Sequence, residues 1–324
     1  MTSGPPAPVP PHDALLIFAD GFGTLETPGL YRLAIADDVA TPSLILEETG
    51  DPDTGIGMWF SSAAAQHYTA GSKLYFTDRD LTASMPFPIM LRRVNIDGTG
   101  LETLDANLVA TLPDSQVQVG PLALAADSLT GDVYLIARCE SDQTFSKLWH
   151  RDGGTGDWTL LRTFSQFDYH FRDMQVDESG GKLLISRRPG GGSEEGVYVF
   201  DLADVSTVEE AAIVVSDGAA PPFCATPSHM LIEQHVGSPS PFWELREWRR
   251  SDYLPAAAPL AVADDGFGGI ARVGSTWYAR EYDDDSGMYG LVRVTVGGSP
   301  GITQAGVLEW PWGLIGPNPT SAMP

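Results

Sequence analysis

The residue types best suited to chemistry gather in a few short segments of the chain. In the segment 169–173 two aromatic residues stand beside a histidine, an arginine and an aspartate. An imidazole and a carboxylate three positions apart, as in His170 and Asp173, are common partners in acid–base catalysis. Further aromatic residues precede other predicted strands and could complete a ligand pocket at the mouth of a channel. The predicted ligand- or partner-binding residues are Trp59, Tyr169, His170, Phe171, Arg172, Asp173, Phe223 and Phe267.

These residues also have a structural interpretation. Aromatic residues at the start of a strand often pack between neighbouring sheets, and an isolated histidine is usually a hydrogen-bonded structural residue. A related hypothesis is that His67, His170 and His229 converge to hold a metal. No catalytic residue is assigned, because the chain has no G-x-S-x-G, H-E-x-x-H, C-x-x-C or P-loop motif.

Acidic residues are concentrated in the segments that connect predicted strands. They are expected to form an acidic rim, made of Asp20, Asp78, Asp80, Glu140, Asp142, Glu194, Glu195, Asp283, Asp284 and Asp285. The last three are the candidate metal ligands, because calcium takes six to eight oxygen ligands and carboxylates on one loop supply several. No calcium loop of the EF-hand type is present, so a solvated acidic turn is the preferred interpretation. No cofactor is expected, and calcium is the one metal to test.

Charge and composition restrict the class of partner. The 324 residues carry a net charge of −24. Nucleic acid and anionic membranes attract clustered Lys and Arg, so neither is expected as a partner. No apolar run is long enough to span a bilayer, and no basic residue precedes Arg32, so a transmembrane segment and a conventional secretory signal are not expected. The location stays open between the cytoplasm and a virion or other assembly. Cys139 and Cys224 fall in different repeats, so two free thiols are expected.

The elements that would position these residues are short strands in a divergent repeat. The clearest copies are at 121–138, 171–188 and 268–283, with weaker ones at 61–78 and 223–234. The second strand of each unit begins at Leu15, Leu74, Val133, Leu183, Met230 and Thr276. Third strands are predicted at 30–36, 89–96, 146–150, 196–201, 242–248 and 288–295, and outer strands at 43–47, 101–105, 158–164, 211–216, 259–263 and 304–310. Four short strands per unit match the blade of a β-propeller.

The first unit lacks an inner strand, whereas an apolar segment at 312–316 remains after the sixth unit. The sequence therefore predicts an all-β, six-bladed propeller over residues 13–316, with four-stranded blades and with the C-terminal strand joining the N-terminal blade. A Pro-rich segment, 1–12, and a tail, 317–324, are predicted to be flexible.

One stretch resembles a known family. The segment KLYFTD at 73–78, followed by LRRVNIDGTGLETL at 91–104, is similar to the YWTD repeat of the propellers in lipoprotein receptors. Asp127 and Asp177 match the aspartate that ends the inner strand of that repeat. The resemblance is clearest in blades 2 to 4. It implies a six-bladed ring whose faces bind other proteins, and structural roles for the matching Asp and Gly residues.

The loops between second and third strands are long in every unit, and binding sites favour loops held by a rigid scaffold. The sequence thus predicts a non-catalytic binding or structural propeller that engages a protein or glycan through its long-loop face. Membership of a larger assembly, such as a virion tail or a surface complex, fits this role. The alternative is an enzyme similar to the gluconolactonase and strictosidine synthase propellers, with its site at the channel. Those with a metal use Glu, Asn and Asp at inner-strand starts, where this chain offers neither Glu nor Asn.

Overall fold

The computed structural model describes most of the repeat region. The described residues are 14–19, 27–36, 39–57, 67–70, 72–84, 87–112, 119–139, 146–164, 170–177, 181–188, 196–205, 209–214, 223–226, 228–236, 242–263, 267–273, 276–283, 288–295, 301–308 and 311–315. The segments predicted to be flexible, 1–12 and 317–324, lie outside them.

Within the described residues the strands form six four-stranded antiparallel sheets. Sheet 1 contains β24 (Pro311–Ile315), β1 (Ala14–Ala19), β2 (Gly29–Ala36) and β3 (Val39–Glu47). Sheet 2 contains β4 (His67–Ala70), β5 (Lys73–Arg79), β6 (Ile89–Asn95) and β7 (Glu102–Asp105). Sheet 3 contains β8 (Val119–Ala126), β9 (Val133–Cys139), β10 (Ser146–Arg151) and β11 (Trp158–Thr163).

The remaining three sheets repeat the same order. Sheet 4 contains β12 (His170–Asp177), β13 (Lys182–Arg188), β14 (Gly196–Asp201) and β15 (Glu209–Val214). Sheet 5 contains β16 (Phe223–Ala225), β17 (His229–Val236), β18 (Phe242–Arg249) and β19 (Ala261–Ala263). Sheet 6 contains β20 (Phe267–Val273), β21 (Thr276–Asp283), β22 (Met288–Thr295) and β23 (Gly301–Leu308).

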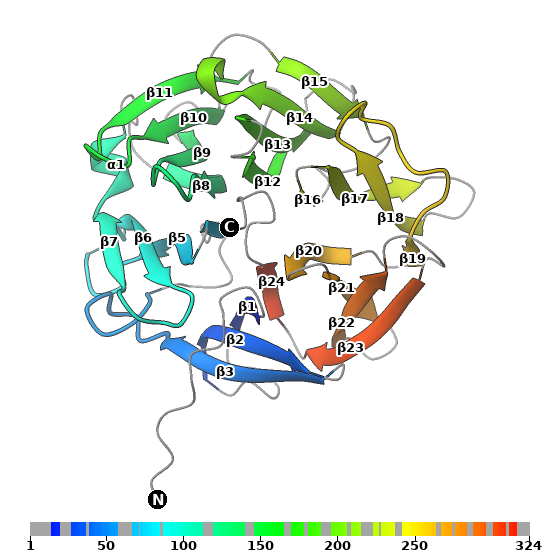
Figure 1. Ribbon diagram of the computed structural model, residues 1–324. Coiled ribbons are helices and arrows are strands. Elements are labelled where there is room, and N and C mark those ends of the chain that lie inside the picture. Colours follow the sequence, from blue (N-terminus) through cyan, green and yellow to red (C-terminus); the bar gives the residue numbers. More distant parts are fainter. Residues whose placement is uncertain are drawn as a thin grey trace, which may run out of the picture.

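The sheets are arranged around a common centre, with strands such as β8, β12, β20 and β24 innermost and β3, β11 and β23 outermost (Figure 1). Each innermost strand contacts that of the next sheet, from β4 through β8, β12, β16, β20 and β24, and β24 in turn contacts β4. The C-terminal strand β24 pairs antiparallel with β1, with Ile17 opposite Leu314. Segments from the two ends of the chain thus share sheet 1.

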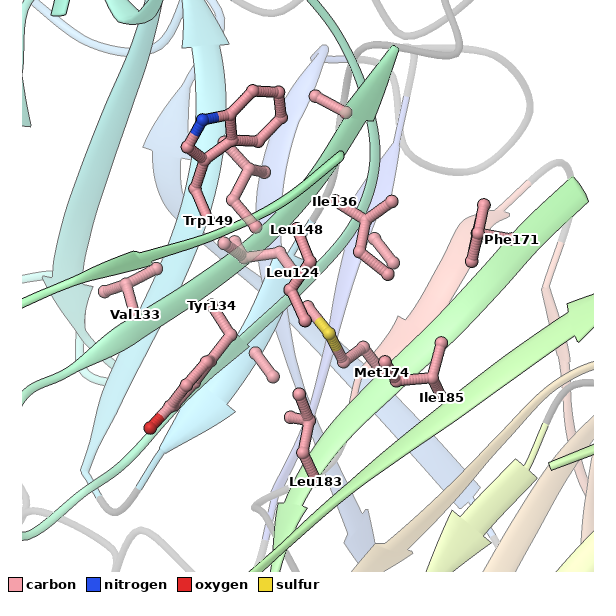
Figure 2. Close-up of a cluster of buried hydrophobic side chains, with 14 of the residues drawn as sticks. Leu124, Val133, Tyr134, Ile136, Leu148, Trp149, Phe171, Met174, Leu183 and Ile185 are labelled. Atoms are coloured by element: carbon pink, nitrogen blue, oxygen red, sulfur yellow. The ribbon is translucent and has the colours of Figure 1, made fainter. Parts of the chain in front are cut away.

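Strands that neighbouring sheets cover on both faces are more buried than the outermost strands. Every residue of β14 except the last is buried, whereas β11 has no fully buried residue. A large apolar cluster extends from sheet 2 through sheet 3 to sheet 4. Of its residues labelled in Figure 2, Leu124, Ile136 and Trp149 belong to sheet 3, and Met174 and Ile185 belong to sheet 4. A single sheet cannot bury both of its faces, so stacking of neighbours provides the core.

The connections divide the ends of the sheets into two faces. We call the end where second strands finish and third strands begin, as at Arg79 and Ile89 or at Val236 and Phe242, the long-loop face, and the opposite end the short-turn face. The turn at 127–132 on the short-turn face is closed by Asp127 Oδ1, which accepts the amides of Leu129 at 2.7 Å and Thr130 at 3.1 Å. Gly131 follows with φ of +77°, a conformation that residues with a Cβ rarely adopt. The structural role predicted for Asp127 agrees with this geometry.

The predicted strands match the structure best near the middle of each sheet. All six predicted third strands agree with β2, β6, β10, β14, β18 and β22 to within one residue. Outer strands differ more, because their exposed residues lack a clear apolar pattern: β3 begins four residues before the predicted 43–47. Two short helical segments, α1 (Leu108–Thr111) and η3 (Leu202–Asp204), were not predicted. Among the described residues no helix has the length and apolar character to cross a membrane.

Candidate functional site

The best-described part of the long-loop face lies at sheet 2, where a buried ion pair holds a connecting segment. Arg92 Nη1 donates to Asp78 Oδ2 at 2.7 Å and to the carbonyl of Gly55 at 2.8 Å, and Nη2 donates to the carbonyl of Pro52 at 2.7 Å. Asp78 Oδ1 also accepts the amide of Gly57 at 3.0 Å. The segment 48–57, which leads from sheet 1 toward sheet 2, is therefore bonded to β5 and β6.

This geometry corrects the assignment of Asp78 to the acidic rim. The residue is 2% exposed, and its carboxylate is occupied by Arg92 and by two backbone amides. Burial raises the pKa of the Asp78 carboxyl, and the bonds from Arg92 act in the opposite direction. Asp78 is also the aspartate of the YWTD-like segment, and its contacts are those of a structural residue.

Asp80, two residues further on, does lie at the surface of this face. Its Oδ1 accepts the hydroxyl of Thr82 at 2.6 Å and the amides of Thr82 and Ala83 at 2.9 and 3.2 Å. The Thr82 hydroxyl in particular holds the pKa of Asp80 below its ordinary value. The carboxylate therefore closes a turn and contributes negative charge to the face.

Polar side chains of β12 reach across to β16 of the next sheet. Gln175 Nε2 donates to the carbonyl of Ala225 at 3.0 Å, and its Oε1 accepts the amide of Ala225 at 2.9 Å. Two residues earlier, Asp173 Oδ2 accepts the amide of Phe223 at 3.2 Å. These bonds satisfy backbone groups on the free edge of the innermost strand of sheet 5.

At the short-turn end of the same two sheets an ion pair makes a third connection. Arg250 Nη1 donates to Asp177 and to the carbonyl of Thr226. Asp177 is 2% exposed, so the pair is buried between sheets 4 and 5. The structural role predicted for Asp177 agrees with this arrangement, whereas neither Gln175 nor Arg250 was identified from the sequence.

The predicted pocket residues separate into different places. Asp173 and Phe223 come together, but through the backbone amide of Phe223. Phe171 packs on Phe164 with ring centroids 4.8 Å apart, in the cluster between sheets 3 and 4. The Phe223 side chain belongs instead to the cluster between sheets 4 and 5. The two described aromatic residues therefore pack between sheets, as in the structural interpretation.

The other predicted residues are only partly described. His170, Arg172, Phe267 and Asp283 have their backbone in β12, β20 and β21, and their side chains lie outside the description. Trp59, Tyr169, Asp284 and Asp285 lie outside the described residues altogether. The acid–base hypothesis for His170 and the calcium hypothesis for the aspartate run thus stay predictions.

The hypothesis of three converging histidines is wrong for His229. That residue begins β17, a second strand, at the short-turn face, and its Nδ1 lies 2.9 Å from Ser228 Oγ. His67 and His170 begin first strands, which start at the long-loop face. Second strands run opposite to first strands, so the three positions cannot meet at one end of the channel. Nowhere in the described part of the chain do three or more His, Cys, Asp or Glu side chains gather as metal ligands do.

Cys224 is a free, buried thiol. Burial raises its pKa well above the ordinary value. The charge of Arg272 acts on this pKa in the opposite direction and that of Asp173 in the same direction. A thiol that stays protonated is a poor nucleophile. Cys139 lies in β9 and its side chain is not described.

A polar cluster at sheet 5 was not identified from the sequence. Glu244 Oε2 accepts bonds from Gln234 Nε2 at 3.0 Å, from Arg246 Nη2 at 2.7 Å and from Arg246 Nε at 3.2 Å. The Glu244 side chain is 8% exposed and that of Arg246 is 21% exposed. The signal in the sequence was a Glu and an Arg two positions apart on one side of the predicted strand 242–248.

The opposite side of the same hairpin carries two rings. His235 and Trp243 are directly opposite each other in the register, and their ring centroids lie 4.8 Å apart. Trp243 also packs on the apolar cluster between sheets 5 and 6. The second side of the hairpin is thus anchored in the core, which fixes the position of the polar cluster on the first.

Comparison with known proteins identifies the fold and no closer relationship. No protein-family model matches the chain, and the search of curated proteins found no match. A chain from the crystal structure of a nidogen/laminin complex superposes with a TM-score of 0.58 at 11% identity, covering 93% of this chain and 97% of that one.

Two further structures have comparable scores. A GH74 enzyme from Niastella koreensis has a TM-score of 0.56 at 12% identity over 91% of this chain and 44% of that one. A protein from Lactobacillus plantarum has a TM-score of 0.51 at 14% identity over 92% and 82%. At such identities the likeness concerns the fold alone: the chain is an all-β protein with the β-propeller fold.

Proposed function

We propose that the six sheets are the six blades of a ring closed by β24, and that the chain is a non-catalytic binding module whose long-loop face engages a protein or a glycan. The ring is supported by the pairing of β24 with β1 and by the series of contacts that returns from β24 to β4. Closure of this kind pairs the edge of β1 and gives sheet 1 the same four strands as the other sheets. A YWTD-type relationship is supported by the resemblance of residues 73–78 and 91–104 to the YWTD repeat.

The observation that carries the binding function is that polar side chains on the innermost strands already bond to the neighbouring sheet. Asp173 and Gln175 bond to backbone groups of the neighbouring sheet, and Asp177 pairs with Arg250. Catalytic groups need free hydrogen-bonding capacity toward a substrate. Side chains that already connect sheets favour a rigid scaffold, and on a scaffold the surface loops carry recognition.

The test is to purify the tagged chain from its natural source, identify what binds, and map the contact by cross-linking mass spectrometry. We expect cross-links to segments of the long-loop face, such as 80–88 and 237–241. Cross-links confined to the short-turn face, such as 127–132, would contradict the proposal. A stable partner of fixed stoichiometry would further support membership of a larger assembly.

The enzyme alternative is examined with the same preparation. A panel of lactones and glycosides is incubated with the wild-type chain and with the variants His170→Ala and Arg172→Ala. We expect no turnover by any of the three proteins. Turnover that disappears in a folded variant would replace the binding function with an active site at the channel.

A further inference from the structure

The hairpin of β17 and β18 has one side that faces sheet 4. Met230, Ile232 and Trp248 on this side pack with residues of sheet 4 in one apolar cluster. Alternate residues of a strand share a side, and directly opposed residues of neighbouring strands do too. The register therefore places Gln234, Val236, Phe242, Glu244 and Arg246 on this same side, nearer the long-loop face.

Burial decreases along this side toward the long-loop face. Met230 and Ile232 are fully buried, with the partly exposed Arg246 opposite Ile232. Gln234 and Glu244 form the next level, and Val236 and Phe242 are half-buried at the end of the hairpin. The polar cluster thus lies where the apolar packing between sheets 4 and 5 gives way to solvent. A carboxylate at this depth is costly without donors, and Gln234 and Arg246 supply them.

The three bonds to Glu244 all end on one oxygen. Among the described residues no donor bonds the second oxygen, Oε1. Arg246 Nη1 has only a long contact, 3.4 Å, to the carbonyl of Ala256. One acceptor and one donor with spare capacity therefore lie side by side, and the half-buried Phe242 is the residue next to Glu244 on this side of β18.

We propose that Gln234, Phe242, Glu244 and Arg246 form a binding subsite for a neutral sugar residue of a glycan. This inference rests on the proposed function and specifies its ligand. One sugar hydroxyl donates to Glu244 Oε1 and a neighbouring hydroxyl accepts from Arg246, which matches the donor and acceptor on a vicinal diol. The apolar C–H face of the ring packs on Phe242.

Charge selects a neutral sugar. Glu244 and Arg246 neutralise each other, so the subsite offers no net positive charge for a sulfate, phosphate or sialic acid. The chain as a whole carries a net charge of −24, which repels anionic ligands at a distance. A hydroxyl-rich neutral ligand satisfies the polar groups without adding charge.

The test is to probe the full-length chain against immobilised neutral, sialylated and sulfated glycans, and to measure the affinity of a bound neutral oligosaccharide by calorimetry. We expect binding of neutral glycans. Phe242→Ala and Glu244→Gln should each weaken it by at least about tenfold. Thermal unfolding of each variant verifies that it is folded, and Phe242→Ala decides the outcome if Glu244→Gln fails to fold.

Two matched variants act as controls. Leu129→Ala removes an apolar side chain that is 79% exposed on the short-turn face. Glu102→Gln alters a carboxylate that pairs with Arg93 at 2.8 Å on the surface of sheet 2. Neither should change the affinity for the glycan.

Three results would overturn the subsite: no glycan binding, binding of anionic glycans alone, or wild-type affinity in folded Phe242→Ala. A protein partner cross-linked to the long-loop face in the same preparations would leave the proposed binding function standing while the glycan ligand fails. Partner contacts restricted to the short-turn face would reject the binding function itself.

Discussion

Sheets 2 and 5 place an arginine at the same position and use it differently. Arg92 lies opposite Phe76 on β5, and Arg246 lies opposite Ile232 on β17. Arg92 is 3% exposed and bonds a carboxylate and two backbone carbonyls of a connecting segment. Arg246 is 21% exposed, and its short bonds go to Glu244 alone.

The carboxylate partner also changes strand between the two sheets. In sheet 2 it is Asp78 on the second strand, opposite Met90, whereas in sheet 5 it is Glu244 on the third strand, opposite Gln234. A repeated fold can thus keep one row of polar positions and assign it two roles. Where both terminal nitrogens of the arginine make short bonds to the protein, as in Arg92, the row is structural. Where one of them makes only a long contact near the surface, as in Arg246, the row is available to a ligand.

The largest expected effect is the loss of stability when the arginine of sheet 2 is removed. Arg92→Ala leaves the Asp78 carboxylate buried without its partner, so the free energy of unfolding should fall by about 3–5 kcal/mol. Chemical denaturation measures it. The neighbouring Arg93→Ala removes a partly exposed pair with Glu102 and a bond to the Tyr75 side chain, and should cost about 1–2 kcal/mol. Equal losses in the two variants would contradict a structural role for Arg92.

A second contrast concerns two glutamines. Gln175→Met removes both bonds to the buried backbone of Ala225, and the unsatisfied groups should lower the free energy of unfolding by about 2–3 kcal/mol. Gln234→Met removes one bond to Glu244 and should cost less than about 1 kcal/mol. The same denaturation assay compares them, and a larger loss in Gln234→Met would reverse the assignment of structural and surface roles.

The arginine of sheet 5 should matter less for folding than that of sheet 2. Arg246→Ala is expected to lower the free energy of unfolding by about 1–2 kcal/mol, because Glu244 keeps its bond from Gln234 and is closer to solvent. A loss as large as that of Arg92→Ala would mean that the sheet 5 cluster is structural too.

Smaller effects are expected from turn aspartates on the two faces. The hydroxyls of Thr82 and Thr99 hold the pKa of Asp80 and Asp97 below the ordinary 3.8. A lowered folded-state pKa gives stability that is present above the ordinary value and is lost as the pH falls through the lowered one. The denaturant concentration at the unfolding midpoint should therefore decrease as the pH drops below about 4. Asp97→Asn should make that decrease smaller. If Asp97→Asn has the same pH dependence of stability as the wild type, Asp97 makes no such contribution.

The smallest effect is expected from calcium. If the aspartates at 283–285 form a solvated turn, the thermal midpoint should be the same in calcium and in chelator, and elemental analysis should find no bound metal. A midpoint that rises with calcium in the wild type and not in Asp284→Asn would assign calcium to the run.

The middle strands could be predicted because they are apolar and punctuated by turns, whereas the polar contacts could not. KLYFTD was recognised as a strand, and the resemblance to a repeat predicted the structural roles of Asp127 and Asp177. The assignment of Asp78 to the acidic rim was wrong, because the position of a carboxylate next to a loop does not reveal that an arginine covers it.

Contacts between sheets depend on register across long separations. Gln175 reaches Ala225, 50 residues away, and Asp177 reaches Arg250, 73 residues away. No local pattern encodes such distances. The sequence likewise did not show that Phe171 and Phe223 are apart, because they pack in different interfaces between sheets.

The central claim, a ring closed by the C-terminal strand, is tested most directly by a disulfide between β1 and β24. In a chain with Cys139→Ala and Cys224→Ala, cysteines replace Ile17 and Leu314, which are opposite each other in the register, within the reach of a disulfide. We expect the bond to form under mild oxidation and the thermal midpoint to rise. The control pair at Leu44 and Leu314 spans from β3 to β24 across the whole sheet, roughly 14 Å, and should stay reduced. A reduced Ile17/Leu314 pair in the folded protein, or an oxidised control pair, would contradict closure of the ring by β24.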